Sequence, residues 1–334
     1  MTLIIRPATP DDIDQMIALL LLDAEERQRE NPVLWKVAPD ASNQIAKALT
    51  FAVTAEQQPF QQLWRLAKSD GQLVGVAHAM RLPVPPIYAG PQGDPGLILP
   101  DCVTAPGAPA GTVDALMEVA ESELSETGAK ILLSSLVTQN EWAATSKRRG
   151  YTPITLYLSK SGLAAGPSAS TVRPATEQDI PGIVARSAEH RAILFSIDPF
   201  WEIHPKADAR FAAWMTRSLT LRDRDMLVLG DASALEGYAI AQPASRLHFP
   251  PAHDITGVGV LDDFYHRDIA DPDALPPDAR GARSLLHAAE AAFTARDIDT
   301  AFFVCPADWT SKLDLLTAAG YQTAMTWSMK RLEG

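Results

Sequence analysis

Two patterns of apolar residues occur in the same order in each half of the chain: short apolar or alternating runs, and segments with an apolar residue every three or four positions. A short apolar run at residues 3–5 predicts a strand, since side chains alternate across a strand. Residues 10–28 and 39–53 return to an apolar position every three or four residues, which predicts two amphipathic helices. In the second half, residues 177–194 and 206–220 predict the matching pair of helices.

Each half then continues with the same series of elements: three strands, a long helix, a buried strand, a short helix and a last strand. In the first half the strands are expected at 63–70, 72–85, 96–104, 130–137 and 152–160, and the long helix is expected at 111–128. In the second half the strands are expected at 226–231, 235–245, 255–265, 299–306 and 322–331, and the long helix is expected at 281–297. The short helix ends at a Gly-Tyr pair in both halves, at Gly150 and Gly320.

Local identities support the repeat. The tetrapeptide RPAT stands at residues 6–9 and again at 173–176, and each copy precedes a predicted helix with a threonine placed to cap it. NPVLW at residues 31–35 corresponds to DPFW at 198–201. Ordered landmarks at near-constant spacing indicate an internal duplication. We therefore expect an N-terminal domain at 1–160, a Ser-, Gly- and Ala-rich linker at 161–170 and a C-terminal domain at 171–334.

Composition narrows the functional classes. The net charge is −12 and no block of Lys and Arg stands out, so neither nucleic acid nor an anionic membrane is an expected partner. The two cysteines, Cys102 and Cys305, lie in different halves, and neither they nor the histidines show the spacing of a metal site. We expect a cytoplasmic protein without a bound metal.

The order of elements resembles the GNAT superfamily of acyl-CoA-dependent N-acyltransferases. The resemblance rests on the RPAT strand, on a strand, glycine loop and helix in mid-domain, and on the Gly-Tyr pair before the last strand. It covers nearly the whole chain twice. It implies a tandem α/β (α+β) protein in which each domain has a mixed, mostly antiparallel central sheet flanked by helices.

The resemblance also implies acetyl-CoA as co-substrate, with its pyrophosphate at a helix N-terminus. Arg280 and Arg283 flank the glycine of the second copy, and Asn140 lies early in the short helix of the first copy. We expect the cofactor-binding residues to be Phe264, Arg280, Gly281, Ala282, Arg283, Ser284, Val103, Gly111, Thr112, Val113 and Asn140. For Asn140, an N-cap of the short helix is an equal alternative.

Candidate catalytic residues gather in the segment LDDFYH of the second half, where the resemblance places the reacting thioester. They are Asp262, Asp263, Tyr265 and His266. On a regular strand Asp263 and Tyr265 would share one face, and Asp262 and His266 the other. Either carboxylate would act as a base for an ammonium group or hold it. Trp35 and Trp201 are expected to line the acceptor side or to belong to the core.

These features together favour acetyl transfer from acetyl-CoA to a primary amine, by direct attack in a ternary complex within the second half. The acceptor would be a small molecule or a peptide, and the protein a monomer or a homodimer. The alternative is an inactive CoA-binding or partner-binding protein. It is favoured by glycine loops that match the family pattern at one position only, and by Ser146 and Leu316 where many members carry a tyrosine.

Overall fold

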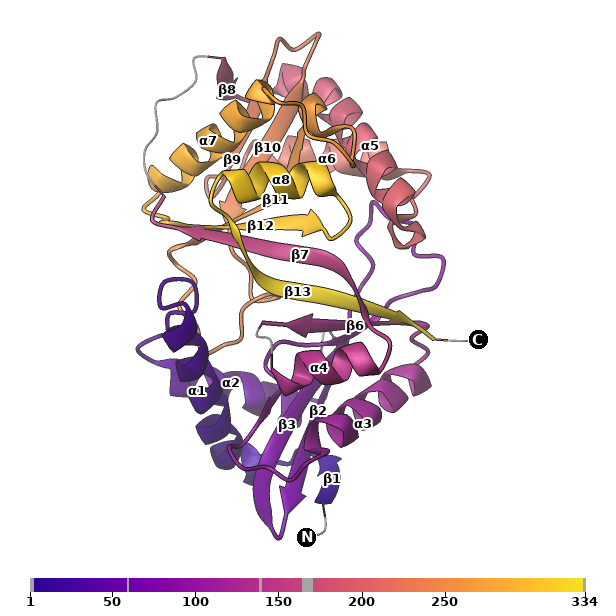
Figure 1. Ribbon diagram of the computed structural model, residues 1–334, viewed down its shortest axis with the longest axis vertical. Coiled ribbons are helices and arrows are strands. Elements are labelled where there is room, and N and C mark those ends of the chain that lie inside the picture. The colour runs from indigo at the N-terminus through magenta and orange to yellow at the C-terminus, as the bar shows by residue number, and fades with distance from the viewer. Residues whose placement is uncertain (1–2, 59, 138–139, 164–170, 333–334) are drawn as a thin grey trace.

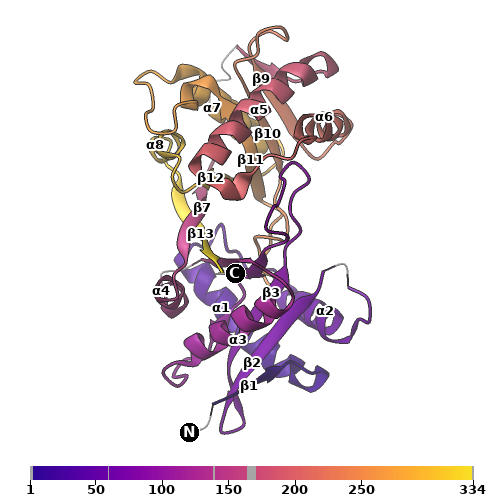
Figure 2. The same cartoon turned by 90° about the vertical axis from the view of Figure 1, so that its right-hand side faces the viewer.

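The computed structural model describes residues 3–58, 60–137, 140–163 and 171–332. Two lobes, one from each half of the chain, meet at a waist formed by long strands (Figures 1 and 2). No helix within the described residues is both long and apolar enough to cross a membrane.

The N-terminal half contains the predicted succession of elements, and most boundaries lie within a few residues of those expected. The strand predicted at 96–104 is divided in two, since the chain bends between Ile98 and Val103. The elements are β1 (Leu3–Pro7), η1 (Pro10–Asp12), α1 (Ile13–Glu30), α2 (Ala41–Thr54), β2 (Gln62–Ser69), β3 (Gln72–Arg81), β4 (Gly96–Ile98), β5 (Val103–Thr104), α3 (Thr112–Glu126), β6 (Ile131–Leu136), α4 (Glu141–Arg148) and β7 (Thr152–Ser161).

The C-terminal half repeats this order with one continuous strand in place of β4 and β5. Most of the predicted linker, residues 164–170, lies outside the described residues. The elements are β8 (Val172–Pro174), η2 (Glu177–Asp179), α5 (Ile180–Ile197), η3 (Pro199–Trp201), α6 (Ala207–Ser218), β9 (Asp225–Leu229), β10 (Gly237–Pro243), β11 (Val258–His266), η4 (Arg267–Ile269), α7 (Arg280–Thr294), β12 (Thr300–Pro306), α8 (Thr310–Ala318) and β13 (Gln322–Arg331).

One sheet runs through both lobes, in the order β1-β2-β3-β4-β6-β13-β7-β12-β11-β10-β9-β8, with β5 beside β3. The two halves exchange their last strands. β13 of the C-terminal half pairs with β6 of the N-terminal half, and β7 of the N-terminal half pairs with β12 of the C-terminal half. The two exchanged strands also pair with each other. Among the described pairs only β4–β6 and β11–β12 are parallel, so the expected mixed, mostly antiparallel sheet is confirmed.

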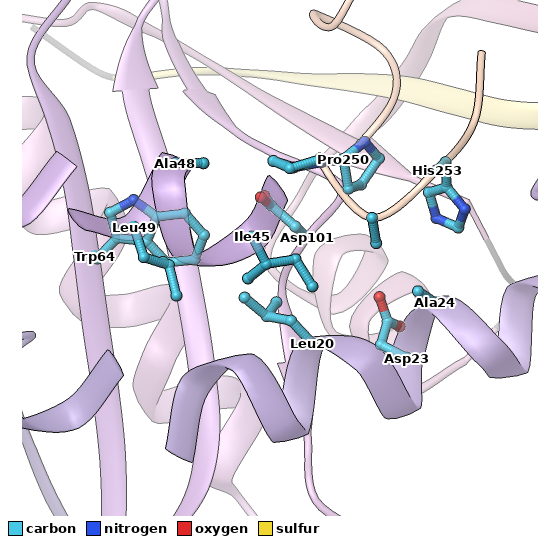
Figure 3. A pocket seen from close by; sticks show the side chains of 12 residues that line it. Leu20, Asp23, Ala24, Ile45, Ala48, Leu49, Trp64, Asp101, Pro250 and His253 are labelled. Atoms are coloured by element: carbon cyan, nitrogen blue, oxygen red, sulfur yellow. The ribbon is translucent and has the colours of Figure 1, made fainter. Parts of the chain in front are cut away.

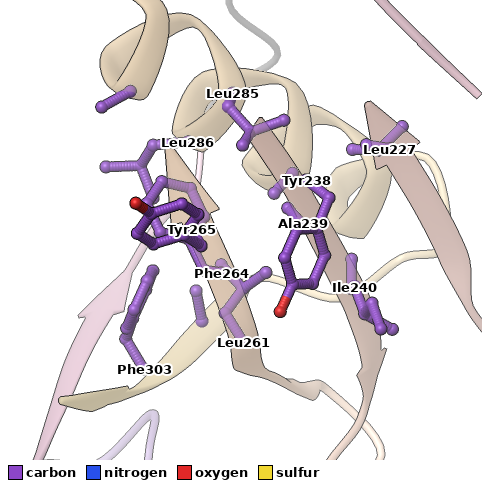
Figure 4. Close-up of a cluster of buried hydrophobic side chains, with 14 of the residues drawn as sticks. Leu227, Tyr238, Ala239, Ile240, Leu261, Phe264, Tyr265, Leu285, Leu286 and Phe303 are labelled. Carbon is purple, nitrogen blue, oxygen red and sulfur yellow. The ribbon is translucent and has the colours of Figure 1, made fainter. Parts of the chain in front are cut away.

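Helices cover both faces of the sheet in each lobe. In the C-terminal lobe, Leu285 and Leu286 of α7 lie over Ala239 of β10 and Phe264 of β11 (Figure 4). Tyr238 of β10 faces the other side, where its ring packs on Phe211 of α6. In the N-terminal lobe, α3 packs on one face while α1 and α2 cover the other. Burial of these apolar side chains is the main stabilising contribution in both lobes.

The repeated RPAT is a structural clamp. The Arg6 guanidinium donates to both carboxylate oxygens of Asp12, at 2.6 and 2.7 Å, and the Thr9 backbone N–H and hydroxyl donate to the same carboxylate at 3.0 and 2.7 Å. Arg173, Thr176 and Asp179 repeat this arrangement. The arginine ties the first strand of each half to the start of the helix that follows.

A second exchange joins the lobes. The loop at 82–95 leaves the N-terminal lobe and forms a bridge between Tyr88 and Ile203 of the C-terminal half (Figure 2). The loop at 244–257 makes the opposite crossing, with a bridge between His253 and Val37. Each lobe is therefore covered by a loop from the other.

We predict that Asp179→Asn lowers the free energy of unfolding by about 1–3 kcal/mol at pH 7, because a charged, buried hydrogen-bond network is lost. The arginine holds the pKa of Asp179 well below its usual range. This stabilisation is therefore fully present above about pH 5 and lost as the pH falls. Urea denaturation at pH 7 and pH 3 should show the difference from the wild type shrinking in acid. Glu177→Gln, an exposed change in the same turn, should have no effect at either pH.

We also predict that the chain unfolds in one cooperative transition, since neither lobe can complete its sheet without a strand of the other. In calorimetry, Asp12→Asn in the first half and Asp179→Asn in the second should lower the same Tm. Two separable transitions, each shifted by one variant alone, would contradict the prediction.

Candidate active site

A cavity of about 830 Å³ lies between the lobes. Its walls come from α5, α6, the end of β11 and the start of α8 in the C-terminal half, together with the 82–95 loop, β6 and β7 of the N-terminal half. Most lining side chains are apolar or aromatic, and few are charged. This size and character match those of sites for small organic ligands.

Both predicted carboxylates face this cavity. Between β10 and β11 the register shifts, so that Asp262 and Asp263 together lie opposite the single residue Ile240. This is a β-bulge, in which an extra residue bends the strand and redirects side chains. The expectation that Asp262 and Asp263 point to opposite faces is therefore wrong, because it assumed a regular strand.

The carboxylate pair lies deep in the protein but reaches solvent through the cavity. Burial raises the pKa of both groups, and the charge of Asp262 raises the pKa of Asp263 further. Lys312 and Arg191 partly oppose this increase. A carboxylate held in this way binds a proton more readily than an exposed one, as a base for an ammonium group requires.

Three of the other polar side chains that line the cavity can take or give a proton or hold a charge near the carboxylates. His190 and Arg191 come from α5, and Lys312 comes from α8. Burial lowers the pKa of His190 and of Lys312, so both favour their neutral forms more than exposed groups would. Of these three side chains, Arg191 alone keeps its positive charge at any ordinary pH.

The parallel strands β11 and β12 pair from Val258 to Leu261 and then separate. The gap beyond Leu261 is filled from α8. Lys312 Nζ donates to the Phe264 carbonyl oxygen at 3.2 Å, and Trp309 is fully buried there with its indole N–H donating to the Ile269 carbonyl. The predicted cofactor residue Phe264 therefore has its carbonyl occupied by a lysine.

At the start of α7, Arg280 and Arg283 are exposed, as an anion-binding role would require. Ala282 N–H, however, donates to the Asp268 carboxylate at 3.1 Å, so a carboxylate occupies the helix N-terminus. Gly281 has a packing role, because a Cβ there would lie 2.2 Å from the ring of His266.

The other predicted catalytic residues lie outside the cavity lining. His266 is buried beneath α7, where its Nδ1 accepts a hydrogen bond from the Asp268 N–H at 3.0 Å. The Tyr265 hydroxyl donates to Glu189 Oε2 at 3.1 Å. Of the four candidates, the structure brings only Asp262 and Asp263 together in the cavity.

In the N-terminal half the space that corresponds to this cavity is filled (Figure 3). Pro250 and His253, on the loop from the C-terminal half, lie over Leu20 and Asp23 of α1 and leave only about 20 Å³. This is room for about one water molecule. Here burial raises the pKa of Asp23 to about 6.

Asp101 occupies the strand position that corresponds to Asp263, since Val103 opposite Val76 matches Tyr265 opposite Tyr238. Its carboxylate contacts His78 Nδ1 at 2.8 Å. The His78 ring stacks on Trp64 with centroids 3.8 Å apart, so this carboxylate is held within a packed cluster.

The predicted cofactor residues of this half lie at the start of α3, apart from two. Gly111 precedes the helix with φ at +83°, a conformation that favours glycine, and a Cβ there would meet no atom within 4 Å. Thr112 and Val113 open the helix, while Val103 pairs with β3. Asn140 accepts hydrogen bonds from Trp142 N–H and Ala143 N–H and so caps α4.

The two predicted acceptor-side tryptophans have different surroundings. Trp201 lines the large cavity, with its ring 5.2 Å from that of Tyr88. Trp35 is buried between Phe249 and His253 of the crossing loop, at 5.1 and 5.2 Å, and is core.

The sequence reasoning missed His190, Arg191, Lys312 and Tyr88. A signal existed on α5, where Ser187, His190 and Arg191 interrupt the buried stripe that runs from Ile183 to Leu194. Polar residues on a core-facing stripe require partners or a cavity. Tyr88 had no such signal, because its place in the cavity depends on a loop that crosses between lobes.

No protein-family model matches the chain, and no curated protein is significantly similar to it in sequence. Solved structures are similar in fold. A tandem GNAT protein from the clavulanic acid biosynthesis pathway is 16% identical with a TM-score of 0.54, over 100% of this chain and 99% of its own. A GCN5-related N-acetyltransferase from Sphaerobacter thermophilus is 14% identical with a TM-score of 0.56, over 99% and 96%.

A GNAT-family acetyltransferase from Colwellia psychrerythraea is 10% identical with a TM-score of 0.50, over the full length of both chains. These similarities extend through both lobes and the strands between them. With the duplicated order of elements, they show that this chain has a tandem GNAT fold.

Proposed function

We propose that the protein is an N-acetyltransferase that moves an acetyl group from acetyl-CoA to a primary amine, with the C-terminal half as the working site. The observation that carries this proposal is the Asp262–Asp263 bulge, which places two carboxylates in a deep cavity where β11 and β12 separate. The tandem GNAT fold supports acyl transfer as the reaction class.

In the proposed step the ammonium group of the acceptor gives its proton to the carboxylate of Asp263. The free amine then attacks the thioester carbonyl carbon, a C–N bond forms and the C–S bond breaks. The CoA thiolate leaves, and the proton that the nitrogen loses as the amide forms converts the thiolate to the thiol. Asp262 lies beside the base, and its negative charge makes Asp263 a stronger proton acceptor.

The residues at α7 fit acetyl-CoA if its pyrophosphate replaces the Asp268 carboxylate at the Ala282 N–H. Arg280 and Arg283 would then face the phosphates. The same contacts favour a second candidate function. The Asp268 carboxylate already occupies the N-terminus of α7, and Lys312 fills the gap between β11 and β12. A protein built in this way would bind an amine without transferring a group to it.

We predict that Asp263→Asn reduces kcat by about 10²–10⁴-fold, the usual contribution of a general base. Initial rates of thiol release in a panel of amines would measure it. Asp101→Asn, at the corresponding strand position of the N-terminal half, is the matched control and should keep wild-type rates. Equal losses in both variants would contradict the assignment to the C-terminal half.

The kcat/KM of the same reaction should increase with pH. Asp263 must be ionised to act, and its pKa is raised, so kcat/KM should rise with pH through a limb well above the ordinary carboxyl value of about 4. Asp262→Asn removes the neighbouring negative charge and should move that limb to lower pH. A limb that does not move would show that another group titrates.

We predict that Asp268→Asn tightens acetyl-CoA binding by about tenfold, because it removes a negative charge from the phosphate position at a helix N-terminus. Calorimetric titration would give affinity and stoichiometry together. Asp271→Asn, an equal charge change at an exposed position of the same loop, is the control. If neither the wild type nor Asp268→Asn binds acetyl-CoA at millimolar concentration, the second candidate function is favoured.

A further inference from the structure

The cavity is far larger than a small amine needs. Its volume of about 830 Å³ lies in the upper part of the range for sites that enclose a drug-sized ligand, about 300–1,000 Å³. A free amino acid or a short diamine would leave most of it to water. Size alone therefore points to a bulky ligand.

The walls are rich in aromatic rings from both halves of the chain. They are Tyr88, Tyr157, Phe200, Trp201, Trp214 and Trp327. Tyr88 and Trp201 face each other across the junction of the lobes, with ring centroids 5.2 Å apart and planes at 56°. Rings in this number favour a flat apolar or aromatic body, since they pack against it over large areas.

The cavity lining carries charges of both signs, and its adjacent carboxylates are Asp262 and Asp263. Of the other charged lining residues, Arg331 is paired with Asp198 and Arg210 donates to the Pro86 carbonyl, which leaves Arg191, Lys312 and Glu202. Tyr88 lines the same cavity as both carboxylates. Burial raises the pKa of its phenol, and the charges of Asp262 and Asp263 raise it further. An ammonium group placed between the carboxylates and this ring would have a charge partner and an aromatic face together. The cavity thus combines a cation site with an extended apolar wall.

Part of the cavity wall is supplied by the N-terminal half, through the 82–95 loop. Tyr88 is held in place by backbone contacts of its loop, from Ala89 N–H to the Glu202 carbonyl at 2.7 Å and from His204 N–H to the Ile87 carbonyl at 3.0 Å. The crossing loop of the other half fills the corresponding space with Pro250 and His253. The 82–95 loop therefore lines an open cavity, whereas the 244–257 loop fills the corresponding space in the other lobe.

We propose that the ligand of this cavity is a primary amine carried on a bulky aromatic body, and that Tyr88 of the N-terminal half selects it. The inference rests on the proposed function only in naming this amine as the acetyl acceptor. The recognition itself is a binding event, and it is measurable without any acyl donor.

The test uses the full chain and calorimetric titration with three probes. 4-Phenylbenzylamine has both the ammonium group and the aromatic body, 4-phenylbenzyl alcohol lacks the charge, and 1,4-diaminobutane lacks the body. We expect the first to bind at least tenfold more tightly than either of the others. Tyr88→Ala should weaken its binding about tenfold, while Tyr88→Phe, which keeps the ring, should stay within about twofold.

Phe51→Ala is the matched control, because it removes an exposed aromatic ring from α2 of the same half. It should leave the Kd for 4-phenylbenzylamine unchanged. Equal affinity for 1,4-diaminobutane, or no binding of 4-phenylbenzylamine at millimolar concentration, would overturn the ligand class. An unchanged Kd in Tyr88→Ala would overturn the role of Tyr88. Binding without acetylation would contradict the proposed transferase function alone.

Discussion

The exchange of the last two strands is the constraint on which the rest of the structure depends. β7 lies between β12 and β13, so that the sheet of each lobe is completed by the other half of the chain. This pairing brings Tyr157 of β7 opposite Val304 of β12, and it brings Trp327 of β13 beside β6. All three residues line the large cavity. The cavity is therefore a product of the duplication and would not exist in either half alone.

Within this nearly symmetric frame, open space is distributed unequally. Both halves keep the Arg–Thr–Asp clamp, a carboxylate at the strand position of Asp101 and Asp263, and a tryptophan after the first helix. The space beside Asp101 is closed by Pro250 and its neighbours, while the space beside Asp263 is an open cavity. The symmetric features stabilise the fold, and the asymmetric loops decide which carboxylate borders an open cavity.

Local pattern predicted nearly every helix and strand, because periodicity is a property of each segment by itself. The helix expected at 39–53 is Ala41–Thr54, and the strand expected at 322–331 is Gln322–Arg331. The strand exchange was not predictable in this way. The apolar alternation of β7 suits β6 of its own half as well as β12 of the other, and only the assembled sheet distinguishes them.

The candidate site was predictable in part. Asp262 and Asp263 stood out as a charged pair at the end of an apolar strand, but the bulge that turns both into the cavity has no signature in one sequence. Gly281 fitted a phosphate loop, and its contact with His266 becomes visible only when α7 is placed over β11. Residues such as Tyr88 were missed because long-range chain crossings bring them to the site.

The position of β13 has a consequence for synthesis on the ribosome. β6 is made early, yet one of its neighbours in the sheet is the last strand of the described chain. At roughly 5–20 residues per second, about 190 residues separate the two by roughly 10–40 s. During that interval the nascent N-terminal half has an unpaired strand edge. Any temporary pairing of β7 with β6 would have to break before the mature arrangement forms, because β13 lies between these two strands in the sheet.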